Sequence, residues 1–101
     1  MSQKFTRFDE FYPFYLGEHS NQVCRRLHFI GTTVGIILFA TAFITQNWWL
    51  LLIGFLQGYA WAWVGHFFFE HNKPASFKQP IFSFMGDWVM YKDILTGKIK
   101  W

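Results

Sequence analysis

Two stretches of the chain decide its fold. Residues 27–45 read LHFIGTTVGIILFATAFIT, and residues 48–69 read WWLLLIGFLQGYAWAWVGHFFF. Neither contains a formally charged residue, and each is about as long as the ~20 residues that an α-helix needs to cross a hydrocarbon core. Only Gln46 and Asn47 separate the two stretches, so the sequence predicts two transmembrane helices joined by a tight turn.

The composition also favours a membrane protein. Of the 101 residues, 52% are hydrophobic, 24% are aromatic and only 15% are charged. A soluble domain of this length buries a modest share of its surface and is not usually so apolar; a hairpin buried in a soluble protein is the alternative. We therefore expect one all-α integral membrane domain over residues 1–101. Its predicted parts are spans at 26–45 and 48–70, with amphipathic interfacial segments at 5–25 and 79–96.

The charges indicate how the hairpin is oriented. The formal net charge is +3, and the connecting turn carries no lysine or arginine. Basic residues remain on the cytoplasmic side, so both termini are expected to face the cytoplasm. Because the two spans divide the basic residues, the chain has no single basic stripe for a nucleic acid. The basic residues are Lys4, Arg7, Arg25 and Arg26 before the first span, and Lys73, Lys78, Lys92, Lys98 and Lys100 after the second.

Amphipathic segments flank the hairpin on both sides. Before it, aromatic residues recur at three- and four-residue spacing from Phe5 to Tyr15, a pattern suited to the membrane surface. Pro13 is expected to end or kink this first helix. After the hairpin, residues 81–95 predict a second surface helix, whose aromatic residues face lipid or the hairpin.

Each span carries a face of small residues that includes a histidine. Small residues let two helix backbones approach closely in lipid, where no hydrophobic effect drives helices together. If these faces meet in an antiparallel hairpin, His28 and His66 lie at nearly the same depth, at the cytoplasmic end. Polar rings inside a membrane are costly and often mark a functional site. The two faces consist of His28, Gly31, Gly35 and Ala42, and of Gly54, Gly58, Ala62 and His66.

All four histidines of the chain lie near that end. His19 precedes His28 and His71 follows His66, but neither pair shares one face of a straight helix, so each pair needs a bend between its members. Imidazole with nearby carboxylates suits iron, zinc, copper or nickel, and the single cysteine, Cys24, excludes a multi-cysteine zinc site. The nearby carboxylates are those of Glu18, Glu70 and Asp87.

Several of these residues have a plainer interpretation. His28 and His66 could share a hydrogen bond with each other, and His71 could be a surface residue in a polar turn. Glu70 could pair with a neighbouring arginine instead of a metal. Asn21 could cap the helix that follows it, because a short polar side chain accepts hydrogen bonds from the first free N–H groups of a helix.

The sequence around the histidines is similar to that of a known family. Residues 14–21 read FYLGEHSN, residues 24–32 read CRRLHFIGT, and residues 65–75 read GHFFFEHNKPA. Together they resemble the Mpo-like family of small membrane domains. Its characterised eukaryotic enzymes are iron(II)-dependent 2-hydroxy-fatty-acid dioxygenases of the endoplasmic reticulum, which shorten a 2-hydroxy fatty acid by one carbon. The resemblance covers most of the chain, roughly residues 5–97.

The resemblance implies a membrane-bound dioxygenase that uses iron(II), dioxygen and a 2-hydroxy fatty acid. The family's histidines match His19, His28 and His66, and its acidic position matches Glu70. His71 is a departure, because many members carry lysine there. We expect His28 and His66 to be catalytic, and these four residues together with His71 to supply the metal ligands.

Some questions of binding and location stay open in the sequence. Arg25 and Arg26, next to His28, could attract the substrate carboxylate or face phosphate headgroups instead. The characterised enzymes are longer, with additional membrane segments, so we expect this short form in a bacterial inner membrane, or in the endoplasmic reticulum if the source is eukaryotic. A homo-oligomer is also expected, because one helix pair buries little surface. A haem-binding electron-transfer hairpin and a non-enzymatic membrane assembly protein are the alternative functions.

Overall fold

The computed structural model describes residues 5–74 and 77–101, and the chain is all-helical over these residues. Lys4 and Ala75, which the sequence analysis used, lie outside the described residues. The predicted fold class, an all-α chain with two long apolar helices, is confirmed. The element order is α1 (Phe8–Gly17), α2 (Gln22–Thr45), α3 (Trp49–Val64), the π-helix η1 (Gly65–Glu70) and α4 (Pro80–Leu95).

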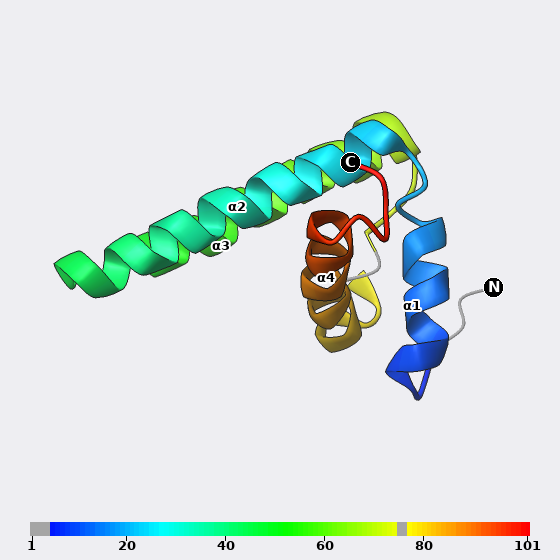
Figure 1. The fold of residues 1–101 in the computed structure, drawn as a ribbon, viewed down its shortest axis with the longest axis horizontal. Helices are drawn as coiled ribbons and strands as arrows, with labels where there is room; N and C mark the ends of the chain where they lie inside the picture. Colours follow the sequence, from blue (N-terminus) through cyan, green and yellow to red (C-terminus); the bar gives the residue numbers. More distant parts are fainter. Residues whose placement is uncertain (1–4, 75–76) are drawn as a thin grey trace.

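The helices α2 and α3 form an antiparallel hairpin, the long arm of the molecule in Figure 1. The turn begins at Gln46, whose φ of 58° is left-handed and ends α2. The two backbones come very close at Gly31, where a Cβ atom would lie 3.0 Å from Trp61 Cβ and 3.3 Å from the carbonyl oxygen of Gly58. The small residues therefore form the contact between the helices, as their spacing predicted.

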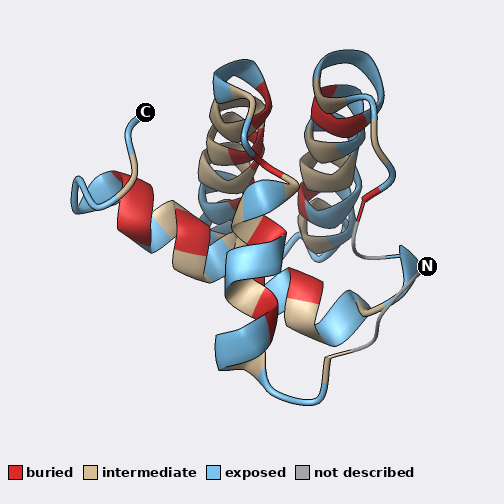
Figure 2. Ribbon diagram, turned by 90° about the vertical axis from the view of Figure 1, so that its right-hand side faces the viewer, coloured by how far each residue is buried: buried red, intermediate tan, exposed pale blue. Residues whose placement is uncertain are grey.

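Both arms of the hairpin are long and apolar enough to cross a membrane. The helix α2 has 24 residues and a mean hydropathy of 2.0, and α3 with η1 has 22 residues and a mean hydropathy of 1.2. Only 22% and 17% of their most apolar windows are buried inside the protein. The outer faces of the hairpin stay exposed in Figure 2, which is unlike the core helix of a soluble protein.

The start of α2 is fixed by a side-chain cap. The Asn21 side-chain oxygen accepts hydrogen bonds from the backbone N–H groups of Val23 at 2.9 Å and Cys24 at 3.2 Å. These groups have no partner inside the helix, so the cap stabilises a beginning at Gln22, ahead of the expected start at Arg26. His28 consequently lies in the second turn of α2.

The helices α1 and α4 pack against each other near the end of the hairpin opposite its turn, and we call this pair the α1–α4 layer (Figure 1). The ring of Tyr15 lies directly over Gly86, where a Cβ atom would meet the ring at 2.9 Å. The Tyr12 hydroxyl donates a hydrogen bond of 2.7 Å to Asp93. The sequence predicted two separate surface helices, whereas the structure joins them through a shared core. That core consists of Phe11, Tyr15, Met90 and Ile94.

Pro13 lies inside α1 and does not end it, and the chain turns only after Gly17. Proline has no N–H group, so the hydrogen bond to the carbonyl oxygen of Asp9 is lost. Asp9 is exposed, and water can satisfy that oxygen. The helix therefore continues through Pro13, so Tyr15 lies on α1 and His19 lies in the turn that follows it.

Candidate metal centre

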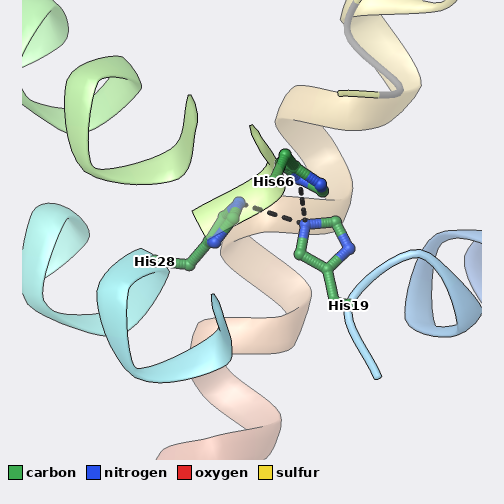
Figure 3. A group of neighbouring side chains, drawn as sticks. All are labelled: His19, His28 and His66. Carbon is green, nitrogen blue, oxygen red and sulfur yellow. Dashed lines mark hydrogen bonds between the residues drawn. The ribbon is translucent and has the colours of Figure 1, made fainter. Parts of the chain in front are cut away.

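Three histidines from different parts of the chain meet where the hairpin joins the α1–α4 layer (Figure 3). His19 lies in the turn after α1, His28 on α2 and His66 in η1. All are buried, with exposed fractions of 1%, 6% and 2% respectively. The Nε2 atom of His19 lies 3.1 Å from that of His28 and 3.0 Å from that of His66. The histidines predicted to face each other are thus joined by a third.

The other ring nitrogen of His19 and of His28 is held by the backbone. His19 Nδ1 lies 2.7 Å from the carbonyl oxygen of Tyr15, and His28 Nδ1 lies 2.9 Å from that of Cys24. A carbonyl oxygen can only accept a hydrogen bond, so each Nδ1 carries the proton and donates it. Each neutral ring then has its lone pair on Nε2, toward the centre of the group.

The ring of His66 is oriented by a side chain. Its Nδ1 atom lies 2.7 Å from the side-chain oxygen of Asn72. The amide nitrogen of Asn72 donates a hydrogen bond of 3.2 Å to the carbonyl oxygen of Glu18, which fixes which end of the amide faces His66. The imidazole therefore donates from Nδ1, and its Nε2 lone pair also points inward.

With all three protons on Nδ1, the close Nε2 atoms have no proton to share. Three lone pairs that converge in a buried site are unfavourable unless a cation lies between them. A divalent metal ion fits this arrangement, because two ligand nitrogens at right angles and ~2.1 Å from a metal lie about 3.0 Å apart. The three ligand atoms all lie within 4.8 Å of one another. The donor set therefore fits a metal with open positions on the side away from the protein ligands.

Burial keeps the centre neutral. Burial first, and then the charges that His28 and His66 would carry, lower the pKa of His19 well below its usual range. A neutral imidazole is the form that ligates a metal. An extra proton shared between the rings is correspondingly disfavoured, which leaves a metal ion as the cation that suits the site.

Neighbouring contacts hold His19 in place. Its ring stacks on that of Tyr15, with ring centroids 4.0 Å apart. A guanidinium nitrogen of Arg25 donates to the carbonyl oxygens of His19 at 3.2 Å and Ser20 at 2.8 Å, so it fastens the turn that carries the histidine. Arg26 lies with its guanidinium carbon 5.4 Å from the ring centroid of Trp101. Both arginines thus engage the protein's own groups.

Glu70 and His71 do not join the three histidines. The carboxylate of Glu70 accepts hydrogen bonds from the backbone N–H of Asn21 and the hydroxyl of Ser20, so it ties the end of η1 to the turn before α2. His71 is exposed and has a left-handed φ of 59°, which turns the chain away as η1 ends. Within residues 5–74 and 77–101, the histidine group contains neither residue.

Sequence reasoning missed two residues that shape the centre. Asn72 entered the sequence analysis only as one residue of the motif at 65–75, although it stands six residues after His66. Asp87 was expected only as a nearby carboxylate. Its Oδ1 accepts a hydrogen bond from the Tyr15 hydroxyl, and burial raises the pKa of Asp87 to about 7. It lines a small cavity together with the three histidines, of about 230 Å³ including the space at its open side.

Residues 5–99 match a family model described as "2-hydroxy-palmitic acid dioxygenase Mpo1-like". The chain belongs to this family. The membership predicted from the two motif halves is thereby confirmed, and the family's name points to a dioxygenase. Neither a curated protein nor a solved structure matches the chain. The family's name and the three-histidine group are consistent with each other, because a histidine group that can bind a metal suits a dioxygenase.

Proposed function

We propose that this protein is a membrane-bound, iron(II)-dependent dioxygenase that shortens a 2-hydroxy fatty acid by one carbon. One observation carries the proposal: three buried Nε2 atoms converge while every Nδ1 atom is engaged by the protein. His19, His28 and His66 are the proposed ligands, with His28 and His66 the catalytic pair expected from the sequence. The expected contributions of Glu70 and His71 are not part of this proposal, because each lies outside the group.

The charge of the site supports the substrate class that the family's description names. Three neutral histidines leave the two positive charges of iron(II) uncompensated, and a 2-hydroxy acid supplies a carboxylate and a hydroxyl that can chelate one metal. Iron(II) would supply a place for dioxygen beside the chelated carbon. The overall reaction balances with dioxygen as the sole oxidant: the 2-hydroxy acid and dioxygen give the shorter acid, carbon dioxide and water.

The protein's own residues would orient the acid and handle its proton. The small cavity beside the histidines is also lined by Asp87, whose buried carboxyl group is placed to accept or return a proton. The Tyr15 hydroxyl donates to this carboxyl group and so keeps it in place. Burial of all three histidines excludes bulk water from the reacting atoms.

We also propose that the hairpin spans a bilayer, as one membrane domain over residues 1–101. The exposed outer faces of both arms, apolar over most of their length, support this placement. The α1–α4 layer would then lie at the cytoplasmic interface with both termini on that side, and the metal centre would lie where a fatty acid's carboxylate meets the headgroups. A bacterial inner membrane is the proposed location.

The test is metal analysis and turnover of protein purified without oxygen in mild detergent. His28→Ala and His66→Ala are expected to lose bound iron and to lose product from 2-hydroxy fatty acids. His71→Ala is the matched control, because it removes an exposed histidine outside the group and should keep both iron and activity. Wild-type protein that binds no iron(II), or histidine variants that stay fully active, would contradict the proposal.

The haem alternative fits the geometry poorly. The pair predicted to bind haem is His28 and His66, whose ring centroids lie 5.1 Å apart. The Nε2 atom of His19 lies 3.1 Å and 3.0 Å from theirs, so the His19 ring takes up the space beside both nitrogens that a haem would need. The non-enzymatic assembly role remains as the outcome favoured if the purified protein binds no metal.

A further inference from the structure

A second, larger cavity opens between the two arms of the hairpin, and residues of α4 also line it. It measures about 540 Å³ including the space at its open side. Both arms contribute small residues to its wall, and α4 contributes Phe84, Asp87 and Trp88. We call this cavity the α2–α3 groove. The glycines of both arms leave their backbones as part of its wall.

The groove leads directly to the metal centre. His28, Tyr59, Ala62 and Asp87 line both the groove and the small cavity that contains His19 and His66. The polar groups of the shared wall are therefore at the histidine end. Away from that end, the wall consists of glycine backbone, aromatic rings and a threonine. A molecule that enters the groove thus meets one polar end and a long apolar remainder.

Two aromatic rings close the far end of the groove. Phe39 from α2 and Phe55 from α3 both line it, with ring centroids 5.1 Å apart. The Phe39 ring lies against Gly54, where a Cβ atom would approach it to 2.6 Å. A glycine at position 54 therefore gives the ring its place, and the ring ends the open space.

We propose that the α2–α3 groove binds the alkyl chain of the substrate, and that Phe39 and Phe55 limit its length. This inference rests on the proposed function for the identity of the polar end group. From His28 to Phe39 an α-helix rises about 16 Å, which matches an extended chain of roughly 13 carbons beyond the chelated end. The expected preference is therefore for 2-hydroxy acids of roughly 14 to 16 carbons, close to the palmitic acid that the family's description names.

Other occupants suit the groove less well. A helix of a partner protein has a diameter of about 10 Å and does not fit a space of this volume between two touching helices. Water needs several polar partners, and the apolar stretch of wall offers few. A single alkyl chain needs none and can enter from the lipid through the open side.

The first test fills the groove without moving the helices. A Cβ atom at Gly58 meets a single neighbouring atom, the carbonyl oxygen of Gly31 at 3.9 Å, so a larger side chain there has room to extend. Gly58→Leu is expected to keep its iron and to lower turnover of long 2-hydroxy acids relative to short ones by about tenfold or more. Ala60→Leu, at an exposed position of the same helix, should behave as wild type.

The second test lengthens the groove. Phe39→Ala removes the closing ring and is expected to move the preferred chain length upward by roughly two to four carbons. Phe43→Ala is the matched control, because its ring lies on the exposed face of the same helix. An unchanged chain-length profile in Phe39→Ala, or unchanged long-chain turnover in iron-loaded Gly58→Leu, would overturn the assignment.

A third measurement does not depend on turnover, so a failure of the proposed reaction can be told from a failure of the groove. The probe is a 16-carbon 2-hydroxy acid with a photoreactive diazirine at its methyl end, applied to protein in lipid nanodiscs. Crosslinks are expected at Phe39 and Phe55, and Gly58→Leu should abolish them. Crosslinks spread over the exposed outer faces, or unaffected by Gly58→Leu, would overturn the groove even if the enzyme is active.

Discussion

In the hairpin the helices meet through glycine and alanine, whereas α1 and α4 meet through aromatic and long apolar side chains. A Cβ atom at Gly31 would press on the opposite helix, at the Trp61 side chain and the backbone of Gly58, so the helices approach closely there. In the α1–α4 layer, by contrast, Phe11, Tyr15 and Met90 are almost fully buried. The hairpin is suited to lipid, where close fit replaces hydrophobic burial, and the layer holds together as a soluble core does.

The metal centre lies where these two kinds of packing meet. His19 belongs to the layer, through its ring contact with Tyr15, whereas His28 and His66 belong to the hairpin. A bound metal would therefore link the two regions. Metal affinity should therefore depend on how well the α1–α4 layer packs on the hairpin. Substitutions in the layer and in the hairpin can be compared for their effects on stability and on metal binding.

The largest effect is expected from breaking the layer. Tyr15→Ala removes a fully buried ring that packs on Gly86, stacks on His19 and donates to Asp87. Truncating a buried aromatic residue costs about 3–5 kcal/mol, so the thermal midpoint in detergent should fall sharply and iron binding should be lost.

Two variants show which contact of Tyr15 matters. Phe14→Ala removes a neighbouring ring that is 43% exposed and should lower the midpoint far less. Tyr15→Phe keeps the ring and loses only the hydrogen bond, so it should retain iron. Equal midpoints for Tyr15→Ala and Phe14→Ala would show that the layer has no cooperative core.

A smaller loss is expected from separating the hairpin. Gly31→Val places methyl groups against Trp61 and the backbone of Gly58, where even a Cβ atom is crowded. Overpacking of this kind costs about 1–3 kcal/mol, measured as a lower unfolding midpoint in detergent. Gly17→Val is the control, because a Cβ atom at Gly17 meets nothing within 4 Å. Equal unfolding midpoints for Gly31→Val and Gly17→Val would mean that the close approach at Gly31 contributes little to the stability of the hairpin.

Features set by local periodicity were predictable from the sequence. The two spans follow from uncharged runs of sufficient length, and the meeting of His28 with His66 follows from the helical period and a tight turn. The family membership also follows from local motifs. Each of these features depends on residues close together in the chain, or on an antiparallel hairpin whose register is set by its short turn.

Features set by distant contacts were not predictable. The hydrogen bond from Tyr12 to Asp93 joins residues near opposite ends of the chain. No local sequence pattern predicts that α1 and α4 share a core. Two of the five predicted ligands lie outside the three-histidine group for a similar reason. Glu70 and His71 are next to the motif in sequence, but the left-handed turn at His71 and the hydrogen bond from Asn21 to Glu70 keep both out of the group.

A moderate loss of metal affinity is expected from releasing the ring of His66. Asn72→Ala removes the acceptor of its Nδ1 proton, which lies 2.7 Å away, and frees the ring to rotate. Loss of such a supporting contact typically weakens metal binding about 10–100-fold, measurable by competition with a chelator. Asn72→Asp keeps an acceptor and should recover much of the affinity, and Asn47→Ala in the far turn should have no effect. Unchanged affinity in Asn72→Ala would mean that packing alone orients His66.

A pH dependence of stability is expected that belongs to Asp87. Burial raises its pKa from 3.8 to about 7, so the folded protein holds a proton that the unfolded chain releases. The contribution of Asp87 to the free energy of unfolding is therefore fully present below about pH 4, and it is lost as the pH rises toward 7. Asp87→Asn keeps an acceptor for the Tyr15 hydroxyl and cannot ionise, so its metal-free midpoint should exceed that of wild type by an amount that grows between pH 5 and 7 and levels off near pH 8. Groups present in both proteins largely cancel in the difference, and Asp9→Asn, at an exposed carboxylate, should show no such trend. A difference that stays constant with pH would mean that Asp87 is already ionised in the folded protein, and that the layer meets the metal centre through a charged carboxylate.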